Sequence, residues 1–159
     1  MMTPTHVADA RQLLRLRELR EDTARDALDR CRRRLADCQG AVQRREQQIA
    51  QVRRERTTLL AWLCGAGAKE LPRVAPAAGA RLGALDEEIE RAELTLSDER
   101  VALADAARAV AVAQGEWVRA RGRRQAVAQL ADEARRVLAH EREMRAEREL
   151  DTPLALQHH

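Results

Sequence analysis

Aromatic residues are almost missing from this sequence: its 159 residues include two Trp and neither Phe nor Tyr. Large aromatic side chains contribute much of the apolar area in ordinary globular cores. Here the apolar residues are mainly Ala, Leu and Val, and charged residues make up 35% of the chain. This composition argues against a compact core and is typical of long helices that bury a narrow seam.

Further absences narrow the functional classes. No stretch approaches the roughly 18 uncharged residues of a membrane span, and residues 1–12 lack the apolar run of a signal peptide. We therefore expect a cytoplasmic protein with no direct membrane insertion. Cys31, Cys38 and Cys64 are odd in number and have no CxxC spacing, so neither disulfides nor zinc are expected.

Positive charge is spread along the chain and matched by negative charge. The sequence has 29 basic and 26 acidic residues, and Lys69 is the only lysine. Arginine runs at 32–34 and 121–124 could contact phosphates, but no aromatic residues alternate with them and no recognition module contains them. We interpret the charge as a solvated surface and predict no nucleic-acid partner.

Two arrays of apolar residues follow the heptad spacing of a coiled coil. The first comprises Leu28, Cys31, Leu35, Cys38, Val42, Arg45, Ile49, Val52, Arg56, Leu59 and Leu63. The second comprises Leu82, Leu85, Ile89, Ala92, Leu96, Glu99, Leu103, Ala106, Val110, Ala113, Trp117, Ala120, Arg124, Val127, Ala131, Ala134 and Leu138. Before Leu28 the spacing falters at Arg17 and Glu21, and Leu13, Leu16 and Leu19 suggest a shifted stripe. We expect a local stutter there.

These arrays predict an all-α fold in which two long helices form an antiparallel coiled-coil hairpin. Residues 1–159 form a single domain in this prediction, with a helix over 4–64, a turn over 65–81, a helix over 82–151 and a tail over 152–159. Thr3 can cap the first helix with Pro4 at its first position, and Gly65 can end it. The glycines and prolines of residues 64–83 indicate the turn.

Pairing positions whose numbers sum to 148 brings bulky side chains opposite small ones along the hairpin. In this register Arg45 and Glu99 fall in adjacent layers, where they could pair and fix the alignment of the helices. Trp117 falls within the seam, where we expect it to pack.

Two short motifs resemble active-site sequences without completing them. GAGAKE at 65–70 lacks the GxxxxGK[ST] spacing of a phosphate loop, and HEREM at 140–144 has Met where the second histidine of HExxH belongs. His158 and His159 could be natural or the remains of a tag and are not interpreted as ligands. With no nucleophile and base, we expect no enzymatic activity, no cofactor and no metal site.

Trp62 lies just beside the predicted seam, one turn from the tip of the hairpin. The indole could contact a partner or pack within the tip, and the sequence favours neither. For partner binding we select the apolar residues near the tip and three arginines near the paired termini. These candidate residues are Leu59, Trp62, Leu63, Leu85, Ile89, Arg142, Arg145 and Arg148.

The whole chain resembles the central stalk proteins of type III secretion, the FliJ/YscO-like family, especially its Arg- and Ala-rich Hrp-type forms. The resemblance rests on length, two long helices, the mid-chain CGAGAKELPRVAPAAG segment, balanced high charge and scarce aromatics. It implies a non-enzymatic stalk that links a hexameric export ATPase to the export gate, at the periphery of a membrane-embedded apparatus. Secretion chaperones are further expected partners.

Two other functions compete with this expectation. One is a generic cytoplasmic coiled-coil scaffold or chaperone adaptor, and the other is an Arg-rich rod that binds nucleic acid. The family orientation would place the terminal residues in the ATPase hexamer and the Trp62 end at the export gate.

Overall fold

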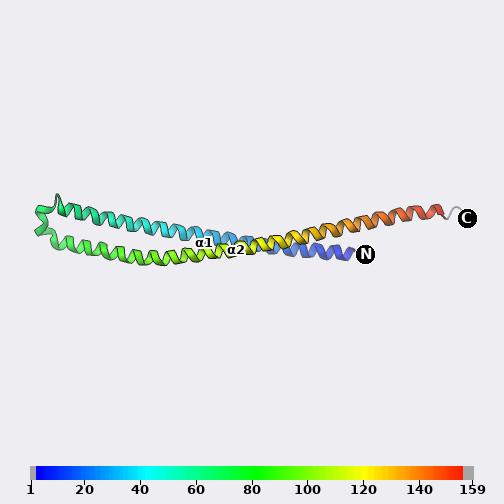
Figure 1. Cartoon of the computed structure of the whole chain (residues 1–159), viewed down its shortest axis with the longest axis horizontal. Helices are drawn as coiled ribbons and strands as arrows, with labels where there is room; N and C mark the ends of the chain where they lie inside the picture. The colour runs from blue at the N-terminus through cyan, green and yellow to red at the C-terminus, as the bar shows by residue number, and fades with distance from the viewer. Residues whose placement is uncertain (1–2, 156–159) are drawn as a thin grey trace. The chain divides into compact units, whose positions relative to one another are not determined.

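The computed structural model describes residues 3–155, and the side chains of residues 3–151. This part of the chain consists of α1 (Pro4–Cys64, 61 residues), the 3-10 helix η1 (Ala68–Glu70) and α2 (Leu71–Ala155, 85 residues) (Figure 1). No strand occurs between residues 3 and 155, and the all-α class is confirmed. His158 and His159 lie outside the described residues.

The ends of α1 agree with the predicted range 4–64. Pro4 is the first helical residue, and the hydroxyl of Thr3 accepts a hydrogen bond from the N–H of His6 at 3.4 Å, as expected of an N-cap. After Cys64, the N–H groups of Gly65 and Gly67 both donate to the carbonyl of Trp62, at 3.2 and 2.8 Å. These bonds satisfy a carbonyl that the helix itself leaves open.

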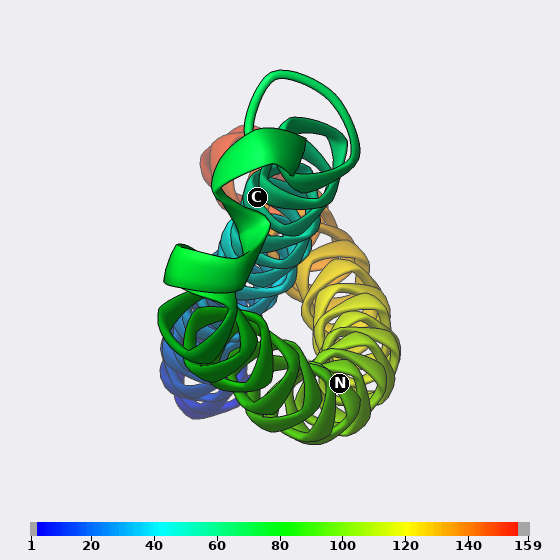
Figure 2. The same ribbon diagram turned by 90° about the vertical axis from the view of Figure 1, so that its left-hand side faces the viewer.

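The predicted turn over 65–81 is wrong in its length, because α2 begins at Leu71 rather than at residue 82. Figure 2 shows the short connection, in green, facing the viewer. Pro72 falls in the first turn of α2, where its missing N–H costs no helical bond, and Pro76 removes only one bond. Alanine is abundant in the segment and is the strongest helix former. No glycine in the described chain has a positive φ, so the glycines of α2 are compatible with the helix.

The predicted end of the second helix at residue 151 is also wrong. α2 continues to Ala155, two residues beyond Pro153, so the predicted tail begins too early. Pro153 does not end the helix, because a proline removes only one main-chain bond and residues 145–150 are strong helix formers.

Contacts divide the chain into two units. Unit 1 comprises residues 1–29 and 112–159, and unit 2 comprises residues 30–111. Each unit therefore contains one segment of α1 and one segment of α2. The single domain over residues 1–159 stays a prediction.

In unit 2 the two helices pack through large aliphatic side chains of α1 and mixed large and small side chains of α2. The buried cluster consists of Val42, Ile49, Ala92 and Leu96, with Leu103 packed against it. All five positions belong to the predicted heptad arrays, so the period of 3.5 residues identified this core correctly.

Ion pairs show how the helices of unit 2 are aligned. Glu46 pairs with Arg100 at 3.1 Å and Arg53 pairs with Glu93 at 2.6 Å, so that higher numbers on α1 meet lower numbers on α2. In both pairs the residue numbers sum to 146, but long side chains that flank a seam can join residues offset along the two helices. The seam register with a sum of 148 therefore stays a prediction.

The polar layer predicted within the seam of unit 2 is present. Nη2 of Arg45 donates to Oε1 of Glu99 at 3.0 Å, and Nη1 of Arg45 donates to Oε1 of Gln48 at 2.6 Å. The two charged side chains are only 31% and 21% exposed. Their pairing allows both charges to occupy a seam that is mostly apolar.

Unit 1 contradicts the predicted stutter. Burial follows the unbroken heptad phase through Arg17 and Glu21, and Leu13, Leu16 and Leu19 are exposed instead. Glu21 is tolerated in the seam because its carboxylate forms an ion pair with Arg124 of α2. The buried residues of unit 1 are Val7, Leu28, Ala113, Ala131 and Ala134.

Candidate functional site

Trp62 is held at the C-terminal end of α1 by the chain that follows it. A methyl group placed on Gly67 would lie only 2.6 Å from Cε2 of Trp62, so the indole rests directly on the glycine. Gly67 is buried, while Trp62 remains 41% exposed. The two alternatives left open by the sequence therefore both describe this residue: Trp62 packs within the turn and also presents an indole surface to solvent.

The other apolar candidates near this turn differ in accessibility. Leu59 and Leu63 of α1 and Ile89 of α2 are half-buried, and Leu85 is 1% exposed. Leu85 is thus a core residue that cannot contact a partner without rearrangement. Leu59 and Trp62 line one shallow surface depression together with Gln51, Arg54, Glu55 and Thr58, all from α1.

The three arginine candidates lie on α2 in unit 1. Arg142, Arg145 and Arg148 are all exposed. Arg145 and Arg148 take part in further polar interactions within the protein, whereas Arg142 lines a groove between the helices of unit 1.

Each unit contains such a groove between α1 and α2, and the two grooves use the same residue spacing. In unit 2 each helix contributes residues at i, i+3, i+4 and i+7: Glu46, Ile49, Ala50 and Arg53 from α1, and Glu93, Leu96, Ser97 and Arg100 from α2. In unit 1 the corresponding residues are Pro4, Val7, Ala8 and Arg11 from α1, and Arg135, Leu138, Ala139 and Arg142 from α2.

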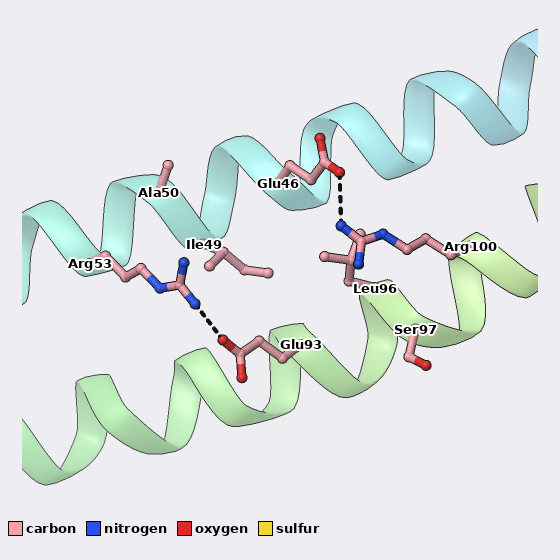
Figure 3. Close-up of a pocket in the computed structure, with 8 residues that line it drawn as sticks. All are labelled: Glu46, Ile49, Ala50, Arg53, Glu93, Leu96, Ser97 and Arg100. Atoms are coloured by element: carbon pink, nitrogen blue, oxygen red, sulfur yellow. Dashed lines mark hydrogen bonds and ion pairs between the residues drawn. The ribbon is translucent and has the colours of Figure 1, made fainter.

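Figure 3 shows the groove of unit 2 with its two ion pairs. The buried side chains of Ile49 and Leu96 form its floor, and the outermost residues on the two helices carry opposite charges. The pairs Glu46–Arg100 and Arg53–Glu93 cross the groove and neutralise it.

Exposed aliphatic side chains form an apolar surface on both helices, which the sequence did not lead us to predict. Leu13 and Leu16 of α1 are 41% and 43% exposed and line a shallow depression with Leu19. Leu130, Val137 and Met144 recur every seven residues on α2 and are also exposed. Their heptad spacing beside the seam could have indicated a second apolar stripe, but the seam itself was the stronger signal.

The two short motifs lie in the connection and on α2. Residues 65–70 form the connection and η1, and no group of three or more His, Cys, Asp or Glu side chains within residues 3–151 could hold a metal ion. Cys31 and Cys38 are half-buried free thiols, and Cys64 is an exposed one. No helix among the described residues is long and apolar enough to cross a membrane.

The fold and the surface define a class: an all-α protein whose accessible features are grooves and apolar patches on paired helices, which are typical of protein–protein contact. No protein-family profile, no curated protein and no solved structure matches the chain.

Proposed function

We propose that the chain is an antiparallel coiled-coil hairpin that acts as the non-enzymatic central stalk of a type III secretion export ATPase. One observation carries the proposal: residues of α1 and α2 pair in opposite order, as in Arg45 with Glu99 and Arg56 with Asp86. Two long helices paired in this way are the architecture that the resemblance to stalk proteins implies. The Arg- and Glu-rich surface suits adjustable polar contact with a surrounding ring.

The two ends of the proposed stalk would bind different partners. The turn offers the exposed face of Trp62 beside half-buried Leu59, a combination suited to apolar docking at the export gate. Arg142, Arg145 and Arg148 offer charge for contact with the ATPase hexamer. Leu85 has no direct role in docking and instead supports the helix pair behind the turn.

The test measures binding to the purified export gate and stimulation of the cognate export ATPase. W62A should weaken gate binding roughly tenfold or more, as expected for loss of a central aromatic contact, and leave helicity and ATPase stimulation unchanged. The triple variant R142E/R145E/R148E should lower ATPase stimulation and leave gate binding unchanged. If the protein neither binds nor stimulates an ATPase that forms hexamers under the same conditions, the stalk proposal is overturned.

The exposed aliphatic residues of unit 1 favour a second candidate, a cytoplasmic coiled-coil scaffold or chaperone adaptor. Leu13, Leu16 and Leu130 present apolar area that a stalk confined to its two ends would not use. A pull-down from secreting cells with the wild-type chain and an L13S/L16S variant distinguishes the functions. Loss of a chaperone with retention of the ATPase would assign this surface to an adaptor role.

A further inference from the structure

The groove of unit 1 has the same residue spacing as the groove in Figure 3, but it is positively charged where the groove of unit 2 is neutralised. Its floor is again apolar, with Val7 buried and Leu138 half-buried, and small residues Ala8 and Ala139 beside them. The outermost residues on the two helices, however, are Pro4, Arg11, Arg135 and Arg142. Among residues 3–151, no acidic residue lines this groove.

The correspondence between the grooves shows what unit 1 lacks. Arg11 and Arg135 occupy the places that Arg53 and Glu93 have in unit 2, and Pro4 and Arg142 occupy the places of Glu46 and Arg100. Arg11 cannot form an ion pair with Arg135, nor can Pro4 form one with Arg142, so neither ion pair of unit 2 has a counterpart here. Within the described chain, Arg135 pairs with Asp132 of its own helix, and Arg11 and Arg142 form no ion pair.

Two features add to the positive potential of this groove. Side chains on the same face of two adjacent helices bring three guanidinium groups around one apolar floor. The groove also lies at the first turns of α1, which begins at Pro4 and has no acidic residue in its first turn. The partial positive charge of the helix N-terminus is thus left uncompensated by α1 itself.

We propose that the groove of unit 1 binds an acidic amphipathic helix of a partner protein. Aliphatic side chains of that helix would pack between Ala8 and Ala139, and carboxylates beside them would form charge-assisted hydrogen bonds with Arg11, Arg135 and Arg142. In unit 2 the chain supplies these carboxylates itself, through Glu46 and Glu93; in unit 1 the partner supplies them.

The groove favours a helix over other acidic ligands for structural reasons. The groove is built from two helices and has no strand edge with which an extended peptide could pair. A nucleic acid would meet an apolar floor without an aromatic residue on which a base could stack. A third helix, by contrast, packs its side chains into the groove between two helices.

The experiment uses the full chain and a synthetic amphipathic peptide of about 15 residues, long enough to form helix, with a Leu ridge flanked by Glu. Binding is measured by fluorescence anisotropy of the labelled peptide. We expect R11E/R142E to weaken binding at least about tenfold, since two charge-assisted contacts become repulsive. A peptide with Lys in place of every Glu should not bind.

The chain offers a matched control for net charge. Arg15 and Arg136 are exposed and do not line the groove, so R15E/R136E changes the net charge equally and should bind the acidic peptide like the wild type. R135E provides a second variant: it places a carboxylate opposite Arg11, as Glu93 lies opposite Arg53, and loses the pair of Arg135 with Asp132. The gain and the loss offset each other, so it should weaken peptide binding with little change in the urea midpoint of unfolding.

Three outcomes would overturn the proposal. These are unchanged binding in R11E/R142E, equal loss of binding in R15E/R136E, and tighter binding of a random-sequence duplex DNA than of the acidic peptide, with the duplex lost in R11E/R142E. The peptide contains no secretion component, so failure here leaves the stalk proposal intact, and failure of the ATPase assay leaves the groove proposal intact.

Discussion

Gly67 shows at the scale of one residue why a small side chain is needed in the connection. Its φ and ψ of −87° and 0° are accessible to any residue, so backbone conformation does not require glycine here. The requirement is space, because the indole of Trp62 occupies the position of a Cβ. The glycine therefore determines where the tryptophan lies.

We predict that G67A displaces the Trp62 indole and lowers the free energy of unfolding by about 1–2 kcal/mol, as expected for an overpacked contact. The emission of Trp62, measured in a variant with Trp117 replaced by Leu, should shift to the red as the ring gains solvent contact. In a W62A background the same glycine substitution should leave the free energy of unfolding almost unchanged. A cost that persists without the indole would mean that Trp62 does not fill this space.

The pair formed by Arg45 and Glu99 supports a second prediction at this scale. E99A leaves a half-buried guanidinium without its interhelical partner, and we expect a loss of about 1–2 kcal/mol in chemical denaturation. R45L/E99L should restore stability to the wild-type value or above, because two apolar residues fit the seam. Equal losses in E99A and in the double variant would contradict this explanation.

The sequence predicted this pair but could not decide the role of Trp62. Arg45 and Glu99 are charged positions in two mostly apolar heptad arrays, and burying opposite charges in one seam favours their pairing. Trp62 depends on a contact with Gly67 that follows from the path of the connection. Periodicity contains no information about that path.

At the scale of the helix, the start of α2 shows how breaker residues can mislead. Glycine and proline within residues 64–83 were interpreted as a turn, yet the helix includes Pro72, Pro76, Gly79 and Gly83. A proline near a helix start removes few hydrogen bonds, and each glycine costs only about 1 kcal/mol relative to alanine. The alanines between them offset part of that cost.

Near the start of α2 we predict that replacing a glycine by alanine stabilises the protein, whereas G67A destabilises it. A Cβ on Gly79 or Gly83 would meet no atom within 4 Å, so G79A and G83A should each stabilise the protein by about 0.5–1 kcal/mol. Thermal unfolding followed by circular dichroism measures the change in stability. The helical signal of the folded protein should also increase. Unchanged stability in both variants would indicate that residues 79–83 are not helical in solution.

The grooves between the helices could not be predicted from either heptad array alone. Each groove needs residues at i and i+7 on one helix to meet their counterparts on the other, and this depends on register. The predicted seam register did not identify the pairing of Glu46 with Arg100 or of Arg53 with Glu93. Buried residues follow from the heptad spacing of each helix, whereas charged neighbours across a groove depend also on how the two helices are aligned.

At the scale of the whole molecule, the hairpin proposal predicts crosslinking within one chain. With Cys31, Cys38 and Cys64 replaced by Ala, R53C/E93C should react with a short bis-maleimide to give an internal link, because the native side chains meet at 2.6 Å. Mass spectrometry of the digested product should identify this internal link, and its yield should not depend on protein concentration.

A neighbouring arginine provides the control for this crosslink. Arg54 bonds to Gln51 of its own helix at 2.8 Å, so R54C/E93C should link poorly under the same conditions. Links found only between two chains would contradict the hairpin and favour an intermolecular pairing of the same helices.

The contrasting charges of the two grooves imply that ionic strength acts on the two grooves in opposite directions. In unit 2 added salt screens the attraction of Glu46 for Arg100 and of Arg53 for Glu93 and so lowers local stability. In unit 1 the same ions screen the mutual repulsion of Arg11, Arg135 and Arg142, and so they raise local stability around the groove. Amide hydrogen exchange between low and high sodium chloride should therefore slow around residues 4–11 and quicken around residues 46–53. The salt concentration would thus shift local opening of the helix pair from one groove toward the other.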